Sequence, residues 1–224
     1  MNTRPLRIRL GALAMAVAGV LFLVYEILPP RLDQETLAGA ESWAEPGWVA
    51  GHVAAMFGLI LFPVAWAALR TSQVDTRAGR PAFLATVTGY FGVAMTLPFY
   101  GGETYGLRAI GRHAEETGDP AMADVGNSFR EDLVAMPIGL VGMILLITAS
   151  ILAAVSIWRS GELNRWSGVP FAVLIALYYP HFLVSHSLRI VWGALVLLSA
   201  FWVARELWRA AALKGERSGG RSPE

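Results

Sequence analysis

Cysteine is absent from the 224 residues of this chain, and charged residues are scarce at 16%. Without cysteine the chain has no disulfide, no thiolate metal site, no iron–sulfur cluster and no covalently attached c-type haem. Soluble domains usually carry about a quarter charged residues, so this chain has too little charge to cover a soluble surface. Its formal net charge of +1 gives no overall field that would attract a nucleic acid. These absences exclude a secreted disulfide scaffold, a disordered chain and a nucleic-acid-binding protein.

Several catalytic signatures are also missing. The sequence has no His-Glu-x-x-His, no Gly-x-Ser-x-Gly, no phosphate-binding loop and no paired-aspartate motif that would hold a magnesium-bound diphosphate. Its four histidines are too few for a histidine-rich di-iron site, and no metal ligands are predicted. A single haem held by His52 with His181 or His186 stays open as an alternative.

What the chain has in excess is apolar length. Hydrophobic residues make up 55% of the chain, and its mean hydropathy is +0.49. A membrane-spanning helix needs about 20 mostly apolar residues, and six segments qualify, the last two being separated by Pro180 and a polar run. The sequence predicts an all-α, polytopic membrane protein with one domain, residues 1–210. Its six transmembrane helices are expected at about 7–28, 48–69, 81–105, 133–158, 166–183 and 186–207.

Basic residues set the predicted orientation. Most of the 18 lysines and arginines lie at the N-terminus, in the loops after the second and fourth spans, or at and beyond the end of the sixth. Because cytoplasmic loops are enriched in Lys and Arg, both termini are predicted to be cytoplasmic, in the inner membrane of a bacterium. Residues 211–224 are expected to form a disordered tail.

The first segment also resembles a secretory signal peptide, because it has a basic start and small residues, Ala38 and Ala40, after its apolar run. The length of the apolar run, followed directly by Pro29 and Pro30, favours a retained first helix.

Ionisable side chains inside the predicted spans are few, and they lie at one level. Charged groups within a span are costly, so each is by default a functional hypothesis. Counted at about 1.5 Å per residue, they cluster near the outer ends of the helices, and the inner half has no comparable set. The cluster consists of Glu26, His52, Glu103, His181, His186 and Arg189, with Asp132 just before the fourth span. The outer connection 106–132 is expected to contain an amphipathic helix that lies on the interface or covers a cavity.

Helical spacing predicts that these groups point into the bundle. The sixth span carries three residues at i, i+3 and i+7 on one face: His186, Arg189 and Gly193. The third span has a similar stripe: Gly89, Gly92, Thr96 and Glu103. Arg189 is therefore the expected partner of Glu103 or of Glu26. The alternative is that such a pair only locks the outer ends of the helices together.

These residue types suit proton chemistry on a lipid-soluble molecule. A carboxyl group in an apolar cavity can stay protonated and act as a general acid, aromatic faces can stabilise a developing carbocation, and a histidine can take the terminating proton. The predicted catalytic set has Glu103 as the acid, with Glu26 and Asp132 as further candidates, and His52 or His181 as the base. The predicted substrate-binding set is Arg189, which positions Glu103, together with His186, Tyr25, Tyr100, Tyr105, Tyr178 and Trp192.

With these features the chain resembles the bacterial integral-membrane terpene cyclases that act on prenylated indoles. It is small, cysteine-free, aromatic-rich and multi-helical, with acids near helix ends. The resemblance covers the whole chain as a profile and rests on no aligned motif. It implies a cofactor-independent enzyme that uses an acidic side chain to cyclise or isomerise an isoprenoid, or a similar hydrophobic molecule that reaches the site from the lipid. Two other functions stay open: a single-haem or metal-binding protein, and a non-catalytic membrane subunit or small transporter.

Overall fold

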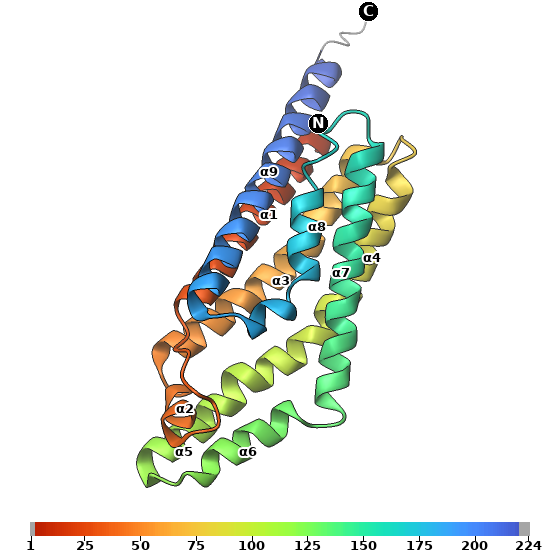
Figure 1. The fold of residues 1–224 in the computed structure, drawn as a ribbon. Helices are drawn as coiled ribbons and strands as arrows, with labels where there is room; N and C mark the ends of the chain where they lie inside the picture. Colours follow the sequence, from red (N-terminus) through yellow and green to blue (C-terminus); the bar gives the residue numbers. More distant parts are fainter. Residues whose placement is uncertain (1–2, 220–224) are drawn as a thin grey trace, which may run out of the picture.

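The computed structural model describes residues 3–219, and within this range the chain is helical and has no strand (Figure 1). In chain order the elements are α1 (Arg4–Ile27), α2 (Leu37–Ser42), α3 (Pro46–Gln73), α4 (Gly79–Gly101), the π-helix η1 (Gly102–Gly106), α5 (Leu107–Thr117), α6 (Ala121–Arg130), α7 (Ala135–Arg159), α8 (Val169–Ala176), the 3-10 helix η2 (Pro180–Leu183) and α9 (His186–Gly219).

Five helices are long and apolar enough to cross a membrane: α1, α3, the continuous helix from α4 through η1 to α5, α7 and α9. α1 and α4 run in one direction along the bundle, and α3, α7 and α9 run in the other (Figure 1). The start of α1, the end of α9 and the connections α3–α4 and α7–α8 lie at one end. The chain is thus an all-α integral membrane protein with its two described ends on the same side of the bundle.

The segment 166–183, predicted as the fifth span, contains no helix of spanning length. It holds α8, of eight residues, and the 3-10 turn η2. Eight residues of α-helix are about 12 Å long, less than half of the hydrocarbon core of a bilayer. α8 ends at Ala176, and Pro180, which has no N–H to donate, begins η2. The chain therefore reverses direction partway along the bundle. The prediction of a fifth span from hydropathy counted the irregular residues after α8 as helix.

Small residues bring the helices close together. α1 lies against α3 and α9, and α4 lies against α7. At Gly92 of α4, an added Cβ would lie 2.9 Å from the backbone oxygen of Gly142 in α7, so the two backbones touch there. Small residues at such crossings let helices approach closely in lipid. The main apolar core lies among these helices, and its larger buried side chains include Met15, Phe22, Leu59, Phe62, Trp66 and Phe171.

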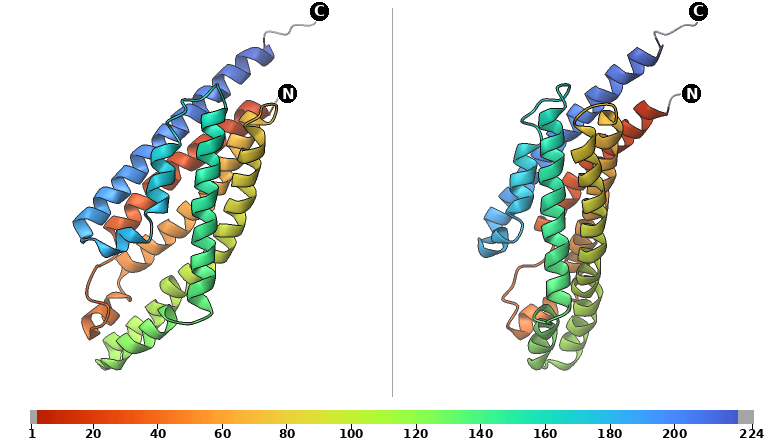
Figure 2. Two further views of the ribbon diagram at one scale, coloured as in Figure 1. Left: turned by 45° about the vertical axis from the view of Figure 1, so that its right-hand side comes forward. Right: turned by 90° about the vertical axis from the view of Figure 1, so that its right-hand side faces the viewer.

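At the end of the bundle away from the termini, α2, α5 and α6 pack on one another and form a cap (Figure 2). The cap has its own apolar cluster, in which Trp43 is fully buried and Leu107 and Ala114 pack beside it. The Thr36 hydroxyl accepts a hydrogen bond of 3.1 Å from the N–H of Gly39 and so caps the start of α2. The amphipathic structure predicted within 106–132 is present as two helices, α5 and α6, which close the bundle over a cavity.

The first part of the segment predicted as a disordered tail is helical. α9 continues through residues 211–219, while residues 220–224 lie outside the described range. Ala210 and Ala211 are buried, and the Lys214 ammonium lies 3.3 Å from the Glu162 carboxylate. These contacts with the rest of the bundle extend the helix beyond the point at which the apolar pattern ends.

Candidate functional site

A cavity of about 480 Å³ lies between the transmembrane helices and the cap. Its walls come from α1 and the α1–α2 connection, from α3, α4, η1, α6 and α7, and from the stretch that contains η2 and the start of α9. The predicted site residues that line it are Tyr25, His52, Tyr100, Glu103, Tyr178, His186 and Arg189. These seven residues come from separate helices and face one space.

His52 and Glu103 form one polar wall of this cavity, which we call the acceptor pole. His52 is buried in α3, and its Nδ1 lies 2.8 Å from the backbone oxygen of Trp48. Because a carbonyl oxygen can only accept, the neutral ring carries its proton on Nδ1 and presents a lone pair at Nε2. That Nε2 faces Oε2 of Glu103 at 4.0 Å. The acceptor pole therefore offers a basic nitrogen beside a carboxylate.

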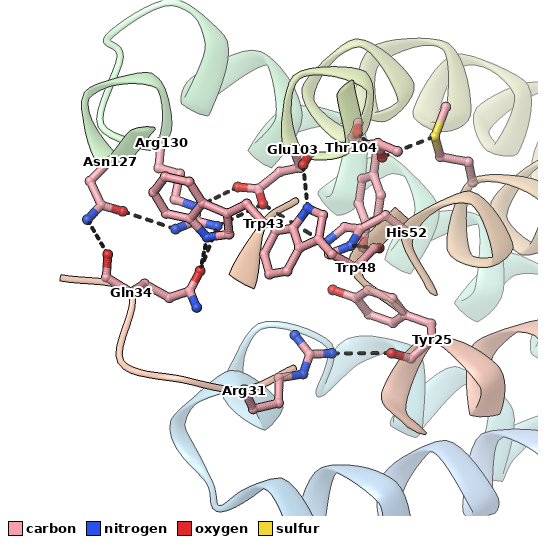
Figure 3. A network of polar contacts seen from close by, with 12 residues as sticks. Tyr25, Arg31, Gln34, Trp43, Trp48, His52, Glu103, Thr104, Asn127 and Arg130 are labelled. Carbon is pink, nitrogen blue, oxygen red and sulfur yellow. Dashed lines mark hydrogen bonds and ion pairs between the residues drawn. The ribbon is translucent and has the colours of Figure 1, made fainter. Parts of the chain in front are cut away.

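The π-helix η1 positions Glu103. A π turn widens the helix by one residue and leaves backbone groups free for outside partners. The indole N–H of Trp48 donates to the Glu103 backbone oxygen at 2.8 Å, and the Thr104 hydroxyl donates to the Tyr100 backbone oxygen at 2.6 Å. The first bond holds the turn against α3 and the second lies within the helix itself, and the Glu103 side chain extends from η1 toward His52 (Figure 3).

Arg130 of α6 is the partner of Glu103, whereas Arg189, expected to pair with Glu103 or with Glu26, pairs with Glu26. The Arg130 guanidinium donates to both carboxylate oxygens of Glu103, at 2.7 Å from Nε and 3.0 Å from Nη2. It also contacts the side-chain oxygens of Gln34 and Asn127 and lies over the ring of Trp43 (Figure 3). A two-pronged arginine pair of this kind is a strong, charge-assisted contact that fixes the position of the carboxylate.

Two arginines that pair with Glu26 form the opposite wall. Glu26 is fully buried, and its Oε2 meets Nε of Arg189 at 3.1 Å and Nη2 of Arg31 at 3.5 Å. His186 contacts the Glu26 backbone oxygen at 3.0 Å. Gly193 makes room for the glutamate, because an added Cβ there would lie 3.1 Å from its Cγ. The face of α9 predicted from the i, i+3, i+7 spacing is therefore confirmed, and it packs on Glu26.

His181, predicted as a base, is held within the protein. Its Nε2 contacts Oε1 of Glu26 at 3.0 Å, and its Nδ1 contacts the backbone oxygen of Tyr178. Its ring stacks on Trp192 with centroids 4.1 Å apart, and the Trp192 indole donates to the Leu174 backbone oxygen. Both ring nitrogens are used in these contacts. Glu26, His181 and Trp192 therefore support the cavity from behind and are not among the residues that line it.

Two other predicted residues lie away from the cavity. Asp132 is exposed at the start of α7, where its carboxylate accepts the N–H groups of Val134 and Ala135 at 2.9 and 2.7 Å. These two bonds lower the pKa of Asp132 below its ordinary value, because they favour the charged form. Tyr105 is 56% exposed. Tyr105 lies within the π turn η1, and Asp132 lies between α6 and α7. The sequence did not show where these helices begin and end, so the directions of the two side chains were misjudged.

The two arginines opposite the acceptor pole have unused donors. Nε of Arg31 and Nη2 of Arg189 are buried and make no hydrogen bond within the part of the chain that the structure describes. Both residues line the cavity, and we call them the donor pole. The Tyr25 ring lies between the poles, with the Arg31 guanidinium 5.2 Å from its centroid and the His52 ring 5.3 Å away on edge. The cavity thus has acceptors at one wall, donors at the other and aromatic rings between them.

The three histidines considered as haem ligands differ in the contacts of their ring nitrogens. His52 has a free Nε2, but both nitrogens of His181 are bonded and Nε2 of His186 is bonded to Glu26. Among the described residues there is no group of three or more histidine, cysteine, aspartate or glutamate side chains that could hold a metal ion.

The chain matches no known protein family, no curated protein and no solved structure in the comparisons made. What it does must therefore be argued from this cavity.

Proposed function

We propose that this protein is a membrane isomerase that moves a proton, and with it a double bond, within a hydrophobic small molecule of the isoprenoid kind. The observation that carries the proposal is the pair His52 and Glu103: a ring nitrogen with a free lone pair, 4.0 Å from a carboxylate oxygen, on the wall of an aromatic cavity. The isoprenoid class comes from the resemblance to membrane terpene cyclases.

His52 takes the first step in this proposal. Its Nε2 removes a proton from a carbon next to a carbonyl group or a double bond, and the C–H electron pair forms a new double bond while the old one shifts. The imidazolium then returns the proton to the far carbon, so the product is an isomer and no second reactant is needed. Glu103 faces the imidazolium Nε2–H and stabilises its positive charge.

The acid-initiated route expected from the sequence fits these contacts less well. Arg130 donates to both oxygens of Glu103, and Glu26 is paired with two arginines, so the oxygens of both carboxylates already accept hydrogen bonds or ion pairs from the protein. The geometry therefore favours the same substrate class and the same overall outcome, isomerisation, with His52 starting the reaction.

We place the protein in the cytoplasmic membrane of a bacterium with both termini in the cytoplasm. The basic connections α3–α4 and α7–α8 lie at the end of the bundle where α1 starts and α9 ends, and this end is proposed to be inside. α8 and η2 together are the fifth of six membrane segments, one that enters and turns back. The cavity then lies in the outer half of the membrane.

Deuterium incorporation tests the proposed reaction without a known substrate. Membranes containing the protein are incubated in D₂O with a lipid-soluble extract of the host, and isoprenoid species are followed by mass spectrometry. A base that exchanges with solvent returns a deuteron, so one component gains one mass unit as it isomerises. His52→Asn should reduce this gain by about 10²- to 10⁴-fold, whereas Glu115→Gln on the exposed face of α5 should not.

The proposal is wrong if no component gains deuterium in a protein-dependent way, or if His52→Asn exchanges as fast as the wild type. Thermal unfolding of each variant in detergent shows whether a loss of exchange comes from the missing base or from a misfolded protein.

A further inference from the structure

We infer that the cavity binds an amphiphile with an anionic head, a carboxylate or phosphate group held by Arg31 and Arg189, and that this molecule comes from the surrounding lipid. The inference deepens the proposed function by naming the substrate class; it rests on that proposal only in taking the occupant of the cavity to be the substrate.

The donor pole has more positive than negative charge. Arg31 and Arg189 both converge on one oxygen, Oε2 of Glu26, while the other oxygen is occupied by His181. The arginine side chains are only 15% and 10% exposed, so water compensates them poorly. Buried charge is costly unless it is paired. One carboxylate shared by two guanidinium groups leaves a cation without a counter-ion at the wall of the cavity.

The unused N–H groups point to the same ligand. Nε of Arg31 and Nη2 of Arg189 are buried and have no acceptor among the described residues, and both residues line the cavity. Arg189 lies over the Phe182 ring at 4.5 Å, and Arg31 lies over the Tyr25 ring at 5.2 Å, so an aromatic face holds each guanidinium. Guanidinium edges held in this way match the oxygens of a carboxylate or phosphate.

The cavity lining also includes apolar residues that suit a hydrocarbon tail. Phe182 and Val184 come from η2 and the residues after it, and Met136, Gly139 and Met143 come from α7. A small free anion would leave this apolar surface uncovered, whereas an anion joined to a hydrocarbon chain covers both parts. The lining therefore favours an amphiphile.

The short fifth segment gives this molecule a path from the lipid. Because α8 ends at Ala176, the outer part of α7 has no fifth long helix beside it, and the wall there is made by η2 and the residues after it. The turns on both sides present exposed apolar residues, Leu133 at 89% and Leu183 at 88% exposure. Such residues are stable in lipid and not in water, so the cavity opens sideways toward the acyl chains.

Three probes test the inference by calorimetric titration of the protein in phosphatidylcholine nanodiscs: farnesyl phosphate, farnesol with the same tail and no charge, and inorganic phosphate with no tail. Farnesyl phosphate should bind about ten- to a hundredfold more tightly than farnesol, as expected for charge-assisted hydrogen bonds to a buried site. Inorganic phosphate should bind more weakly still.

Two variants assign the preference to the donor pole. Arg31→Gln and Arg189→Gln should each lower the affinity for farnesyl phosphate at least tenfold and leave farnesol binding unchanged, while Arg112→Gln, on α5 outside the cavity, should change neither. If Arg189→Gln fails to fold, Arg31→Gln still decides, because its contact with Glu26 is longer and it lies in the α1–α2 connection.

Three results would overturn the inference: equal affinity for farnesyl phosphate and farnesol, inorganic phosphate binding as tightly as farnesyl phosphate, or a preference that survives both arginine variants. His52→Asn should leave farnesyl phosphate binding intact. Binding without any deuterium exchange would therefore remove the proposed isomerase reaction and keep the anionic-head site, so the two proposals fail separately.

Discussion

Glu103→Gln is the substitution that tests the acceptor pole most directly. The change keeps the shape of the side chain and removes its negative charge. In the proposed reaction the carboxylate stabilises the imidazolium that His52 becomes, so the variant should bind the substrate and lose most of its exchange rate.

The expected size follows from the distance between Nε2 of His52 and Oε2 of Glu103, which is 4.0 Å. Two unit charges at this distance interact by about 4 kcal/mol at an effective dielectric constant of about 20. If all of this is lost in the transition state, the rate falls by about 10³-fold. Arg130 already opposes part of the attraction, because its cation lies on the same carboxylate. A loss of about 10²- to 10³-fold is therefore expected.

The deuterium-exchange assay measures the loss of rate. A double variant then tests whether the loss comes from charge. In Glu103→Gln the Arg130 cation is left unpaired near the imidazolium, so adding Arg130→Gln should recover at least about tenfold of the rate. Wild-type exchange in Glu103→Gln, or a double variant slower than the single one, would refute this account of the pair. Equal thermal stability of the three proteins is the required control.

Three further predictions concern structure. Glu26→Gln should lower the free energy of unfolding by about 3–5 kcal/mol, because the buried Arg189 loses its partner; denaturant titration measures this, and an unchanged midpoint would contradict it. Gly102→Ala should displace the Phe129 ring, which would lie 2.1 Å from the added Cβ, and so lower exchange by disturbing α6 while farnesol binding persists. Asp132→Ala should lower the Tm at pH 7, and the difference from the wild type should shrink as the pH falls through the folded pKa of Asp132, because a carboxylate whose pKa is lowered by folding stabilises the protein above its unfolded pKa and loses this effect below the folded value. A difference that stays constant through the acid range would exclude the charge of Asp132 as its cause.

Hydropathy and helical periodicity predicted the parts of this protein that depend on local sequence. Four of the long helices follow apolar runs, and the shared face of His186, Arg189 and Gly193 follows from a spacing of three and four residues. Placing the polar groups at one level was enough to predict that Tyr25 and His52 face a common space, because every helix crosses the same thickness.

The sequence did not show which arginine pairs with each carboxylate, because the paired residues lie far apart along the chain. Arg130 reaches Glu103 only because α5 and α6 fold back over the bundle, which brings residues 27 positions apart together. Arg31 lies in the α1–α2 connection, outside the predicted spans, so the set of charged residues inside the spans did not include it. No residue pattern marks the π turn. The apolar sequence that forms α8 continues up to Pro180, so the sequence did not show that the helix ends earlier, at Ala176.

The turn Gly102–Gly106 contains one residue more than the α-helical turn it replaces. Removing a single residue there would restore α geometry and rotate the chain beyond it by about 100° relative to α4. Glu103 and α5 could not then keep their present partners together, although the hydropathy of every span would be unchanged. Related chains that have the acceptor pole should therefore differ in length at this turn from related chains that lack it. An insertion or deletion of one residue, more than any substitution in the spans, separates a protein with this site from one that only shares its membrane topology.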